Sequence, residues 1–469
     1  MILVREMITI GFDNRLLFLS PRMIRRAMKY SAFKNDYIYA NVSLKFMFRY
    51  ALIFLVFPFL SCSSSSEEST STESPTDTTS VVDDTLVVEE ADYCNEEVTV
   101  GAGRFDQYLN LLEGKRVALV GNQSSMVGDK HLVDTLLDQG VNVVKVFSPE
   151  HGFRGKADAG EEVNNETDSK TGLPIVSLYR KDKAPRENEL TDVDVILFDI
   201  QDVGARFYTY ISTMSYVMEA AAKYGKEMIV LDRPNPNGHY VAGPVLQSNT
   251  KSFVGMHSVP VVHGMTIGEY AKMVDGEGWM SAQLKDRLTV ITCQGWDHMK
   301  FYEVPIAPSP NLPNMTSIYL YPGLCWFEGT VVSIGRGTDI PFQCVGHPKF
   351  EVDVLEDLHS FTPEPNEGSS KPKLEGETCH GYDFSSLSLE ELRDFRFNIR
   401  YFLEFYEKLG MGSSFFLSSG FIHNLVGRRD FKDQVIAGKS QEEIEMSWQE
   451  DLETFKSIRF NYLLYPDFE

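Results

Sequence analysis

The sequence lacks the local signatures that mark several large classes of enzyme. It has no G-x-G-x-x-G dinucleotide fingerprint and no GxxxxGK[ST] phosphate loop, so a nucleotide-dependent enzyme is not expected. HExxH and CxxC metal spacings and a G-x-S-x-G nucleophile turn are also missing. A metal held by scattered ligands such as His151, His257 and His263 is a minor alternative, and we predict neither a metal nor a cofactor.

Basic residues are scarce relative to acidic ones, and cysteines are few. The chain has 44 Lys and Arg against 67 Asp and Glu, a formal net charge of -23, which repels phosphate backbones and argues against a nucleic-acid partner. Cysteine pairs at metal spacing are absent. Apart from Cys62, we expect buried thiols, with a disulfide left open, at Cys94, Cys293, Cys325, Cys344 and Cys379.

A long hydrophobic run is missing too. The segment "MFRYALIFLVFPFLSC" (47–62) has an apolar stretch shorter than the roughly 20 residues that span a bilayer. Its small Ser61 before Cys62 is typical of a lipoprotein signal peptide, with an uncleaved anchor helix as the alternative. We therefore expect Met47 to be the true start and residues 1–46 an upstream extension. Residues 63–94, rich in Ser, Thr and acidic side chains, are expected to be a disordered tether.

The folded part of the chain alternates apolar strands with amphipathic helices. "KRVALVGNQSS" (115–125) is predicted to be a strand and a turn. The residues that follow predict a helix, a glycine that ends the helix and a second strand, and the chain then repeats this order. This pattern indicates a parallel sheet covered on both faces. We predict an α/β fold, with a Rossmann-like, doubly wound domain over residues 95–313. After "PSPNLP" a smaller α+β domain over 314–469 is expected, with capped helical runs at 388–409 and 440–465.

Polar clusters follow three of the predicted strands. They are "PEHGFRG" after "VVKVFS", "DIQDVGARFYTY" after "DVILF", and "DRPNPNG" after "MIVL". Because ligands in such sheets bind beyond the carboxyl ends of the strands, these loops are expected to form one site.

Carboxylates near aromatic side chains favour glycoside hydrolysis. Such enzymes use one carboxylic acid to protonate the leaving oxygen and a second carboxylate as nucleophile or water activator. Glu150, Asp199, Asp202, Asp232 and Glu328 are the candidates. For Asp199 and Asp232, a structural role as helix cap or loop brace is an equal alternative.

The motifs together resemble the exo-β-N-acetylmuramidase (NamZ) family. They are "FSPEHGFRG", "DIQDVGARFYTY", "LDRPNPNG", "HGMTIGEYA", "PSPNLP", "LYPG", "FEGT", "GRGTDIPF" and "DLETFKSIRFNYLLY". The resemblance runs from about residue 113 to the C-terminus. It implies removal of terminal N-acetylmuramic acid from the non-reducing end of peptidoglycan fragments, with the active site in the cleft between the two domains. Together with the signal peptide, it predicts a secreted enzyme lipid-anchored to a bacterial membrane.

The resemblance assigns the catalytic glutamate to Glu150, as general acid/base. His151 is expected to orient Glu150 or bind a sugar hydroxyl, with a loop brace as the alternative. Asp202, Asp199 and Glu328 compete for the role of the second catalytic carboxylate, and Asp202 is the one we include in the predicted catalytic set. The predicted substrate-binding residues are Arg154, Asp199, Arg206, Tyr208, Asp232, Asn235, Asn237, His263, Asn311, Glu328 and Arg336.

Among these residues, an arginine is expected to bind the lactyl carboxylate that distinguishes muramic acid from glucosamine, and Arg206 is the first choice. The asparagines are expected to bind sugar hydroxyls and the N-acetyl group. Two alternatives remain: a muropeptide- or carbohydrate-binding lipoprotein without turnover, and an amidase or esterase acting on wall peptides.

Overall fold

The chain divides into two compact units, Met1–Val88 and Glu89–Glu469. The computed structural model describes residues 11–12, 15–16, 97–150, 152–153, 166–351 and 358–469. In the first unit the described residues form one antiparallel strand pair, β1 (Gly11–Phe12) and β2 (Arg15–Leu16). The start at Met47, the lipidation site Cys62, the tether 63–94, His151 and Arg154 lie outside the described residues.

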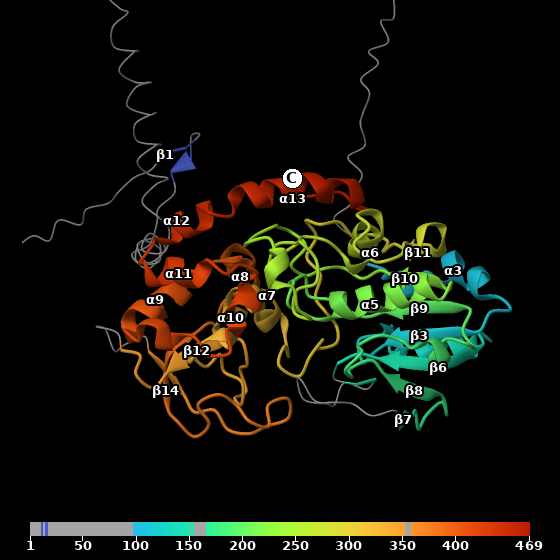
Figure 1. Ribbon diagram of the computed structural model, residues 1–469, viewed down its shortest axis with the longest axis horizontal. Coiled ribbons are helices and arrows are strands. Elements are labelled where there is room, and N and C mark those ends of the chain that lie inside the picture. The colour runs from blue at the N-terminus through green and yellow to red at the C-terminus, as the bar shows by residue number, and fades with distance from the viewer. Residues whose placement is uncertain (1–10, 13–14, 17–96, 151, 154–165, 352–357) are drawn as a thin grey trace, which may run out of the picture. The chain divides into compact units, whose positions relative to one another are not determined.

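The second unit is built on a seven-stranded sheet in the order β11-β10-β9-β3-β6-β8-β7. All neighbours are parallel except β7 and β8. Counted along the chain, the parallel strands read 3-2-1-4-5-6 from β8 to β11, which is the order of the dinucleotide-binding fold. The predicted Rossmann-like, doubly wound sheet is confirmed (Figure 1). The strands are β3 (Val117–Gly121), β6 (Val143–Ser148), β7 (Glu166–Thr167), β8 (Pro174–Ser177), β9 (Val195–Asp199), β10 (Glu227–Leu231) and β11 (Leu288–Ile291).

Both faces of the sheet are buried, which explains the uninterrupted apolar strands. In β3, Val117 and Leu119 pack in a cluster with α3 (Phe105–Leu112) and α4 (Leu132–Asp138). The alternate residues Ala118 and Val120 belong to a second cluster with helices α5 (Tyr210–Lys223) and α6 (Ile267–Gly276), because successive strand residues point to opposite faces.

The rest of the second unit is mixed α+β, as predicted. After α7 (Met315–Leu324) comes an antiparallel sheet in the order β12-β14-β13. Its strands are β12 (Cys344–His347), β13 (His359–Phe361) and β14 (Cys379–Asp383). The helices that follow are α8 (Leu389–Phe395), α9 (Arg400–Leu409), α10 (Phe421–Val426), α11 (Phe431–Ile436), α12 (Gln441–Met446) and α13 (Gln449–Arg459). A short hairpin of β4 (Met126–Val127) and β5 (Lys130–His131) lies near α4.

The two predicted helical runs are capped as expected but are each broken. Ser388 and Ser440 accept hydrogen bonds from the backbone N–H groups of Glu391 and Glu443, completing two capping boxes. The first run ends at Arg396, whose φ of 47° lies outside the helical region, and the chain resumes as α9. The second run breaks between α12 and α13, which lie in red across the top of Figure 1.

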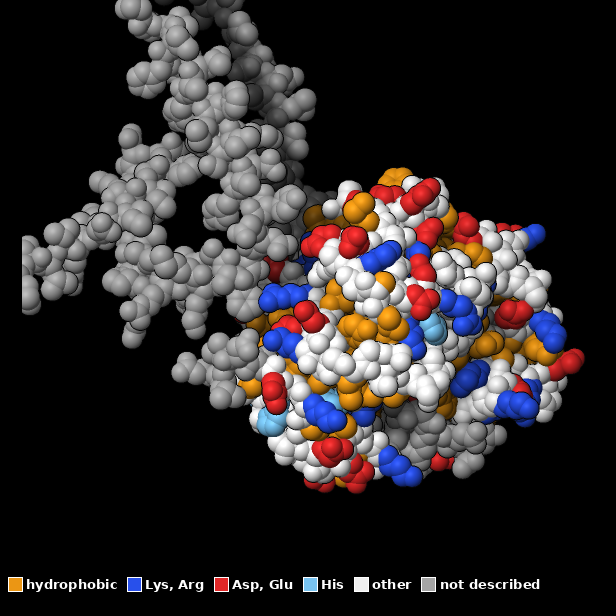
Figure 2. Space-filling view, turned by 60° about the vertical axis from the view of Figure 1, so that its left-hand side comes forward, with side chains coloured by type: hydrophobic (Ala, Val, Ile, Leu, Met, Phe, Trp, Pro, Cys, Tyr) orange, Lys and Arg blue, Asp and Glu red, His pale blue; other side chains and the backbone are white. Residues whose placement is uncertain are grey.

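One hydrophobic core joins the sheet half to the C-terminal half. Phe198 and Met214 from the first half belong to the same cluster as Trp326, Phe402 and Trp448 from the second. The two halves, before and after residue 313, therefore share one hydrophobic core. On the face shown in Figure 2, acidic and basic side chains are interspersed and no large patch of one sign forms. The four described cysteines, Cys293, Cys325, Cys344 and Cys379, are free and buried.

Candidate active site

A cavity of about 270 Å³ lies between the two halves, beside the carboxyl ends of β6 and β9. It occupies the cleft expected from the sequence. Glu150, Phe207, Tyr208, Thr209, Tyr210, Val254, Ser309, Asn311 and Leu312 line it from the first half. Tyr321, Cys325, Glu328, Arg336, Phe342, Phe421 and Leu425 line it from the second half.

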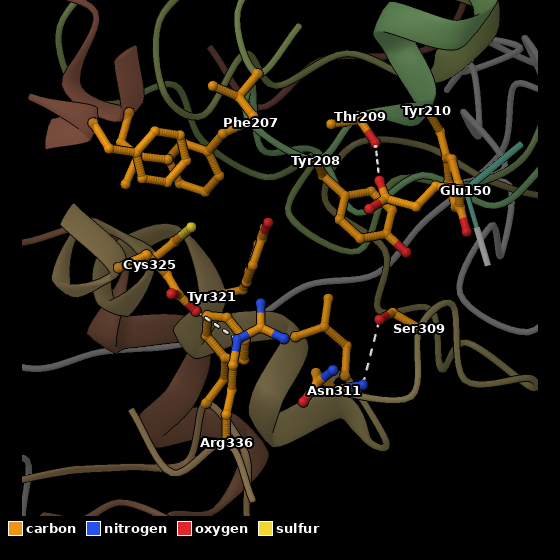
Figure 3. A pocket seen from close by; sticks show the side chains of 16 residues that line it. Glu150, Phe207, Tyr208, Thr209, Tyr210, Ser309, Asn311, Tyr321, Cys325 and Arg336 are labelled. Carbon is orange, nitrogen blue, oxygen red and sulfur yellow. Dashed lines mark hydrogen bonds and ion pairs between the residues drawn. The ribbon is translucent and has the colours of Figure 1, made fainter. Parts of the chain in front are cut away.

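Glu150 sits in the turn that follows β6. Gly152 closes this turn with a backbone hydrogen bond to Pro149 (3.1 Å) and has a φ of 76°, a conformation that glycine adopts without strain. Glu150 Oε2 accepts a hydrogen bond from Thr209 Oγ1 at 2.8 Å (Figure 3). Burial raises the pKa of Tyr179, and the charge of Glu150 and a hydrogen bond to it add to the shift. The Thr209 hydroxyl therefore orients the carboxylate at the cavity wall, and Tyr179 lies near it.

An aromatic wall stands beside Glu150. The hydroxyls of Tyr208 and Tyr210 both donate to the carbonyl oxygen of Pro308, at 2.8 and 3.2 Å, and their rings meet edge to face with centroids 4.9 Å apart. Asn122 Nδ2 donates to the Tyr210 hydroxyl at 2.9 Å. Burial raises the pKa of both tyrosines, so both remain neutral phenols that offer apolar ring faces.

Glu328 and Arg336 form an ion pair on the C-terminal side of the cavity (Figure 3). Arg336 Nε lies 2.5 Å from Glu328 Oε1, and the guanidinium carbon lies 4.9 Å from the centre of the Phe342 ring. Burial alone would raise the pKa of Glu328, but the charges of Arg336 and Lys373 hold it below its usual value. Glu328 is therefore ionised at neutral pH, and Arg336 presents a fixed cation to the cavity.

Five of the predicted site residues come together at this cavity: Glu150, Tyr208, Asn311, Glu328 and Arg336. Asn311 is fixed by donating to the carbonyl oxygen of Gly368 at 2.7 Å. The other predicted residues that the structure describes do not line the cavity. They are Asp199, Asp202, Arg206, Asp232, Asn235, Asn237 and His263.

Arg206, the first choice for binding a substrate carboxylate, has a different environment from the one expected. Its side chain is fully buried, and its guanidinium donates to four backbone carbonyl groups at 2.7 to 2.9 Å. Two of these carbonyls belong to Pro244 and Val259 and two to Leu425 and Val426. The residue joins the two halves behind the cavity instead of facing it.

The predicted aspartates at the ends of β9 and β10 are braces. Asp199 accepts two hydrogen bonds from Arg233, at 2.6 and 2.9 Å, in a buried ion pair that joins the two strand ends. Asp232 accepts from Thr266 Oγ1 (2.7 Å), from the Gly268 N–H (2.7 Å) and from the Tyr465 hydroxyl (2.6 Å). These contacts match the structural role that the sequence left open for both.

Asp202 and His263 form a buried pair outside the cavity lining. Asp202 Oδ2 accepts from the Gly204 N–H at 2.7 Å and lies 3.9 Å from His263 Nε2. Among the described residues, Asp202 Oδ1 and His263 Nε2 have no hydrogen-bond partner. Burial raises the pKa of Asp202 to about 7 and lowers that of His263 to about 3. The expected catalytic role of Asp202 is not supported by this placement.

The two asparagines of "DRPNPNG" hold loops together. Asn235 Nδ2 donates to the carbonyl oxygen of Met265 at 2.9 Å, while its Oδ1 accepts from the N–H of Asn237. Asn237 Nδ2 in turn donates to the carbonyl oxygens of Val203 and Ile318, at 2.9 and 3.1 Å. Both side chains are engaged with the protein backbone, and Asn237 ties its loop to α7, the helix that carries the cavity residue Tyr321.

Several cavity residues were not predicted. Thr209 and Tyr210 stand in the motif "DIQDVGARFYTY", from which Asp199, Asp202, Arg206 and Tyr208 were predicted and these two were not. Tyr179, which is near Glu150 but outside the cavity lining, was also missed; it follows β8, a parallel strand of four residues whose carboxyl end lies at the same edge of the sheet as that of β6. The rule that located the other loops would have found Tyr179 had β8 been recognised. In the described part of the chain no group of three or more His, Cys, Asp and Glu side chains is placed to hold a metal ion.

Comparison with known proteins agrees with these features. The family models described as exo-β-N-acetylmuramidase NamZ, N-terminal and C-terminal, match residues 117–316 and 319–465. The peptidoglycan β-N-acetylmuramidase NamZ of Bacillus subtilis (strain 168) is 37% identical over 378 residues, covering 76% of this chain and 89% of the relative.

Two crystal structures of DUF1343 family proteins from Bacteroides fragilis NCTC 9343 are also similar. One is 45% identical with a TM-score of 0.72, and the alignment covers 79% of this chain and 100% of that one. The other is 31% identical with a TM-score of 0.68, with 79% and 99% covered.

Proposed function

The chain belongs to the exo-β-N-acetylmuramidase NamZ family, and from this we propose that it removes N-acetylmuramic acid from the non-reducing end of peptidoglycan glycan fragments. The observation that carries the proposal is Glu150, hydrogen-bonded to Thr209 at the wall of a cavity of about 270 Å³. This volume is near the lower end of the usual range for small-molecule sites and suits one sugar residue.

Glu150 is assigned as the general acid and base. Protonated, it gives its proton to the glycosidic oxygen as the bond to the anomeric carbon breaks, and as a carboxylate it can accept a proton from the attacking group. The Thr209 hydroxyl holds the carboxyl group in one orientation. The Tyr208 and Tyr210 rings supply apolar faces against which a sugar can pack.

Glu328 is the best supported candidate for the second carboxylate. Of the three candidates from the sequence, it lines the cavity and is held ionised by Arg336 and Lys373, whereas Asp199 and Asp202 are buried in other contacts. A carboxylate in this state can stabilise the positive charge that develops on the sugar ring in the transition state.

Arg336 is assigned to the lactyl carboxylate of muramic acid. Its Nε is engaged by Glu328, and within the described residues no hydrogen bond is made by its two terminal nitrogens. The guanidinium lies over the Phe342 ring at the cavity wall, and its two terminal nitrogens can bind a carboxylate. Arg336 thus takes the role that the sequence gave first to Arg206.

The reaction is tested with two disaccharides that differ in the order of their sugars. We expect the full-length protein to release free N-acetylmuramic acid from a disaccharide in which N-acetylmuramic acid is β-linked to N-acetylglucosamine. Chromatography of the products measures this release. It should leave the disaccharide in the reverse order intact. Release of N-acetylglucosamine from the reverse disaccharide, or cleavage of wall peptides alone, would contradict the assignment. Binding without release would favour the non-catalytic lipoprotein.

We further propose, from the sequence of residues 47–62, that the protein is exported and anchored by a lipid on Cys62. In the part of the chain that the structure describes, no helix is both long and apolar enough to cross a bilayer. Expression in a bacterial host with a clickable fatty acid should label the protein, and C62S should abolish the label. Labelling of C62S equal to that of the parent would refute lipidation at this residue.

A further inference from the structure

A tight turn beside the cavity places two consecutive side chains on different sides of its wall. Ser252 and Gly255 exchange backbone hydrogen bonds of 2.9 and 3.0 Å, which leaves Phe253 and Val254 at the tip of the turn. Val254 lines the cavity. Phe253 is not part of that lining and instead meets Tyr179, with ring centroids 6.2 Å apart.

Phe253 belongs to a half-buried group of aromatic rings that adjoins Glu150. Tyr216 stacks on Phe253 with centroids 6.2 Å apart and planes at 27°, and Tyr179 is close enough to Glu150 for the carboxylate charge to raise the pKa of its phenol. The Nζ atom of Lys183 lies 3.8 Å from the Tyr179 ring centre and 4.2 Å from that of Phe253. We call Tyr179, Lys183, Tyr216 and Phe253 the aromatic rim.

The backbone of the rim is strained at Lys183. Its φ of 50° is uncommon for a residue other than glycine, and its N–H is bonded to the carbonyl oxygen of Arg180 at 3.1 Å. Strained residues of this kind persist where the surroundings determine the conformation, and they cluster at ligand sites. Here the strained loop delivers an ammonium group to two aromatic rings next to the catalytic glutamate.

The rim lies where the second sugar of the substrate has to be. If the cavity holds the terminal muramic acid residue, as proposed above, the glycosidic oxygen faces Glu150 and the next sugar extends past Glu150 out of the cavity. The rim adjoins the cavity through two of its lining residues, Glu150 and Val254. Rings that are half exposed, next to a cation, match an N-acetylated amino sugar, which has an apolar ring face and several oxygen acceptors.

We propose that the aromatic rim is the binding site for the leaving-group sugar, an N-acetylated hexosamine. The sugar ring packs against Phe253 and Tyr179, and the Lys183 ammonium donates a hydrogen bond to a hydroxyl or acetamido oxygen. This inference rests on the proposed function, because that function decides which sugar occupies the cavity.

Binding to a variant that cannot turn over tests the rim separately from catalysis. Full-length Glu150→Gln is titrated with two ligands: methyl β-N-acetylmuraminide, which fills only the cavity, and the disaccharide that carries N-acetylglucosamine on the leaving side. We expect the disaccharide to bind more tightly. Adding Phe253→Ala should weaken disaccharide binding about tenfold and leave methyl muraminide binding within about twofold. Unchanged methyl muraminide binding also shows that the cavity is still folded.

A second variant and a matched control complete the test. Lys183→Gln should also weaken the disaccharide selectively, whereas Lys181→Gln, an exposed lysine in the same loop, should change neither affinity. The proposal is overturned if the Phe253 and Lys183 variants bind the disaccharide as tightly as Glu150→Gln alone, or lose both ligands equally. The proposed function is judged separately, by turnover of the disaccharide by the unmodified protein.

Discussion

At the scale of single residues, the charged groups of the cavity are fixed before a substrate arrives. Arg336 is held by Glu328 and Phe342, and Glu150 is held by Thr209. A preorganised group loses little free energy to reorientation when a ligand binds. The difference in binding free energy between two similar sugars then depends on the contacts that each sugar makes with that group. Each of these residues can be tested by a substitution that leaves the other in place.

Arg336 is expected to distinguish muramic acid from glucosamine. A charge-assisted pair contributes about 1.5–3 kcal/mol, so Arg336→Gln should lower kcat/KM for a β-N-acetylmuraminide by roughly 10- to 100-fold. The inhibition constant of N-acetylglucosamine should change little, because that sugar has no lactyl carboxylate, whereas that of N-acetylmuramic acid should rise. Arg336→Lys, which keeps the charge without the fork, should be intermediate. Equal losses of affinity for the two sugars would rule out carboxylate recognition.

Asp202 is expected to make stability depend on pH. Its pKa of about 7 in the folded protein exceeds its value of 3.8 in a model compound, so between these values the folded state binds more protons than the unfolded state. The free energy of unfolding should therefore fall as the pH rises through this window. Relative to the parent, Asp202→Asn should gain on the order of 3 kcal/mol by pH 8. Urea unfolding at pH 5 and pH 8 measures this, and the exposed Asp129→Asn should show no such trend.

At the scale of elements, loops at the carboxyl edge of the sheet meet helices of the C-terminal half. Arg206 lies where they join, since its guanidinium binds the 244–259 segment and the end of α10 together. Leu425, one of its partners, lines the cavity itself. The shape of the cavity therefore depends on a residue that no substrate touches.

Replacing Arg206 should destabilise the protein strongly. Arg206→Ala leaves four buried carbonyl groups without their donor, and each such group costs about 1–3 kcal/mol, so a loss of about 3 kcal/mol or more in the free energy of unfolding is expected. Arg429→Ala, an exposed arginine that donates to the carbonyl oxygen of Asn249, should lose less than about 1 kcal/mol. Similar losses of unfolding free energy in the two variants would contradict the proposal that Arg206 joins the two halves.

The elements of the fold differ in how far sequence patterns can predict them. The parallel sheet and the loops at its edge followed from local periodicity, because apolar strands and glycine-terminated helices are local signals. Whether an edge residue faces the cavity or braces the fold was not predictable. Arg206 binds carbonyls 219 and 220 positions away in the chain, and Asp232 binds Tyr465, 233 positions away. Such pairings depend on the packing of the two halves and leave no local pattern.

At the scale of the whole molecule, the C-terminal residues return to the sheet half. The Leu464 N–H donates to Glu269 Oε1 (2.8 Å), the Tyr465 hydroxyl to Asp232 Oδ2 (2.6 Å), and the His298 N–H to the carbonyl oxygen of Pro466 (3.1 Å). No residue of the motif "DLETFKSIRFNYLLY" lines the cavity, although this motif is one of those that carry the family resemblance. It closes the unit instead of contributing to the site.

Removal of the Tyr465 hydroxyl should show how much the contact of the C-terminal residues with the sheet half contributes to stability. Tyr465→Phe deletes the hydrogen bond to the buried Asp232 and should lower the free energy of unfolding by about 1–3 kcal/mol. Tyr462→Phe removes a hydroxyl that donates to the exposed Glu277 and should cost less than about 1 kcal/mol. Chemical unfolding of both variants gives the comparison, and an unaffected Tyr465→Phe protein would show that the tail is not a brace.

The central claim is that Glu150 catalyses the release of N-acetylmuramic acid, and one assay tests it most directly. The full-length protein and its Glu150→Gln variant are each incubated with a chromogenic β-N-acetylmuraminide and with the matching β-N-acetylglucosaminide. The account predicts release from the muraminide alone, reduced by about 10²- to 10⁴-fold in the variant. Release by Glu150→Gln at the rate of the parent would contradict the assignment of Glu150, and release from the glucosaminide alone would contradict the function.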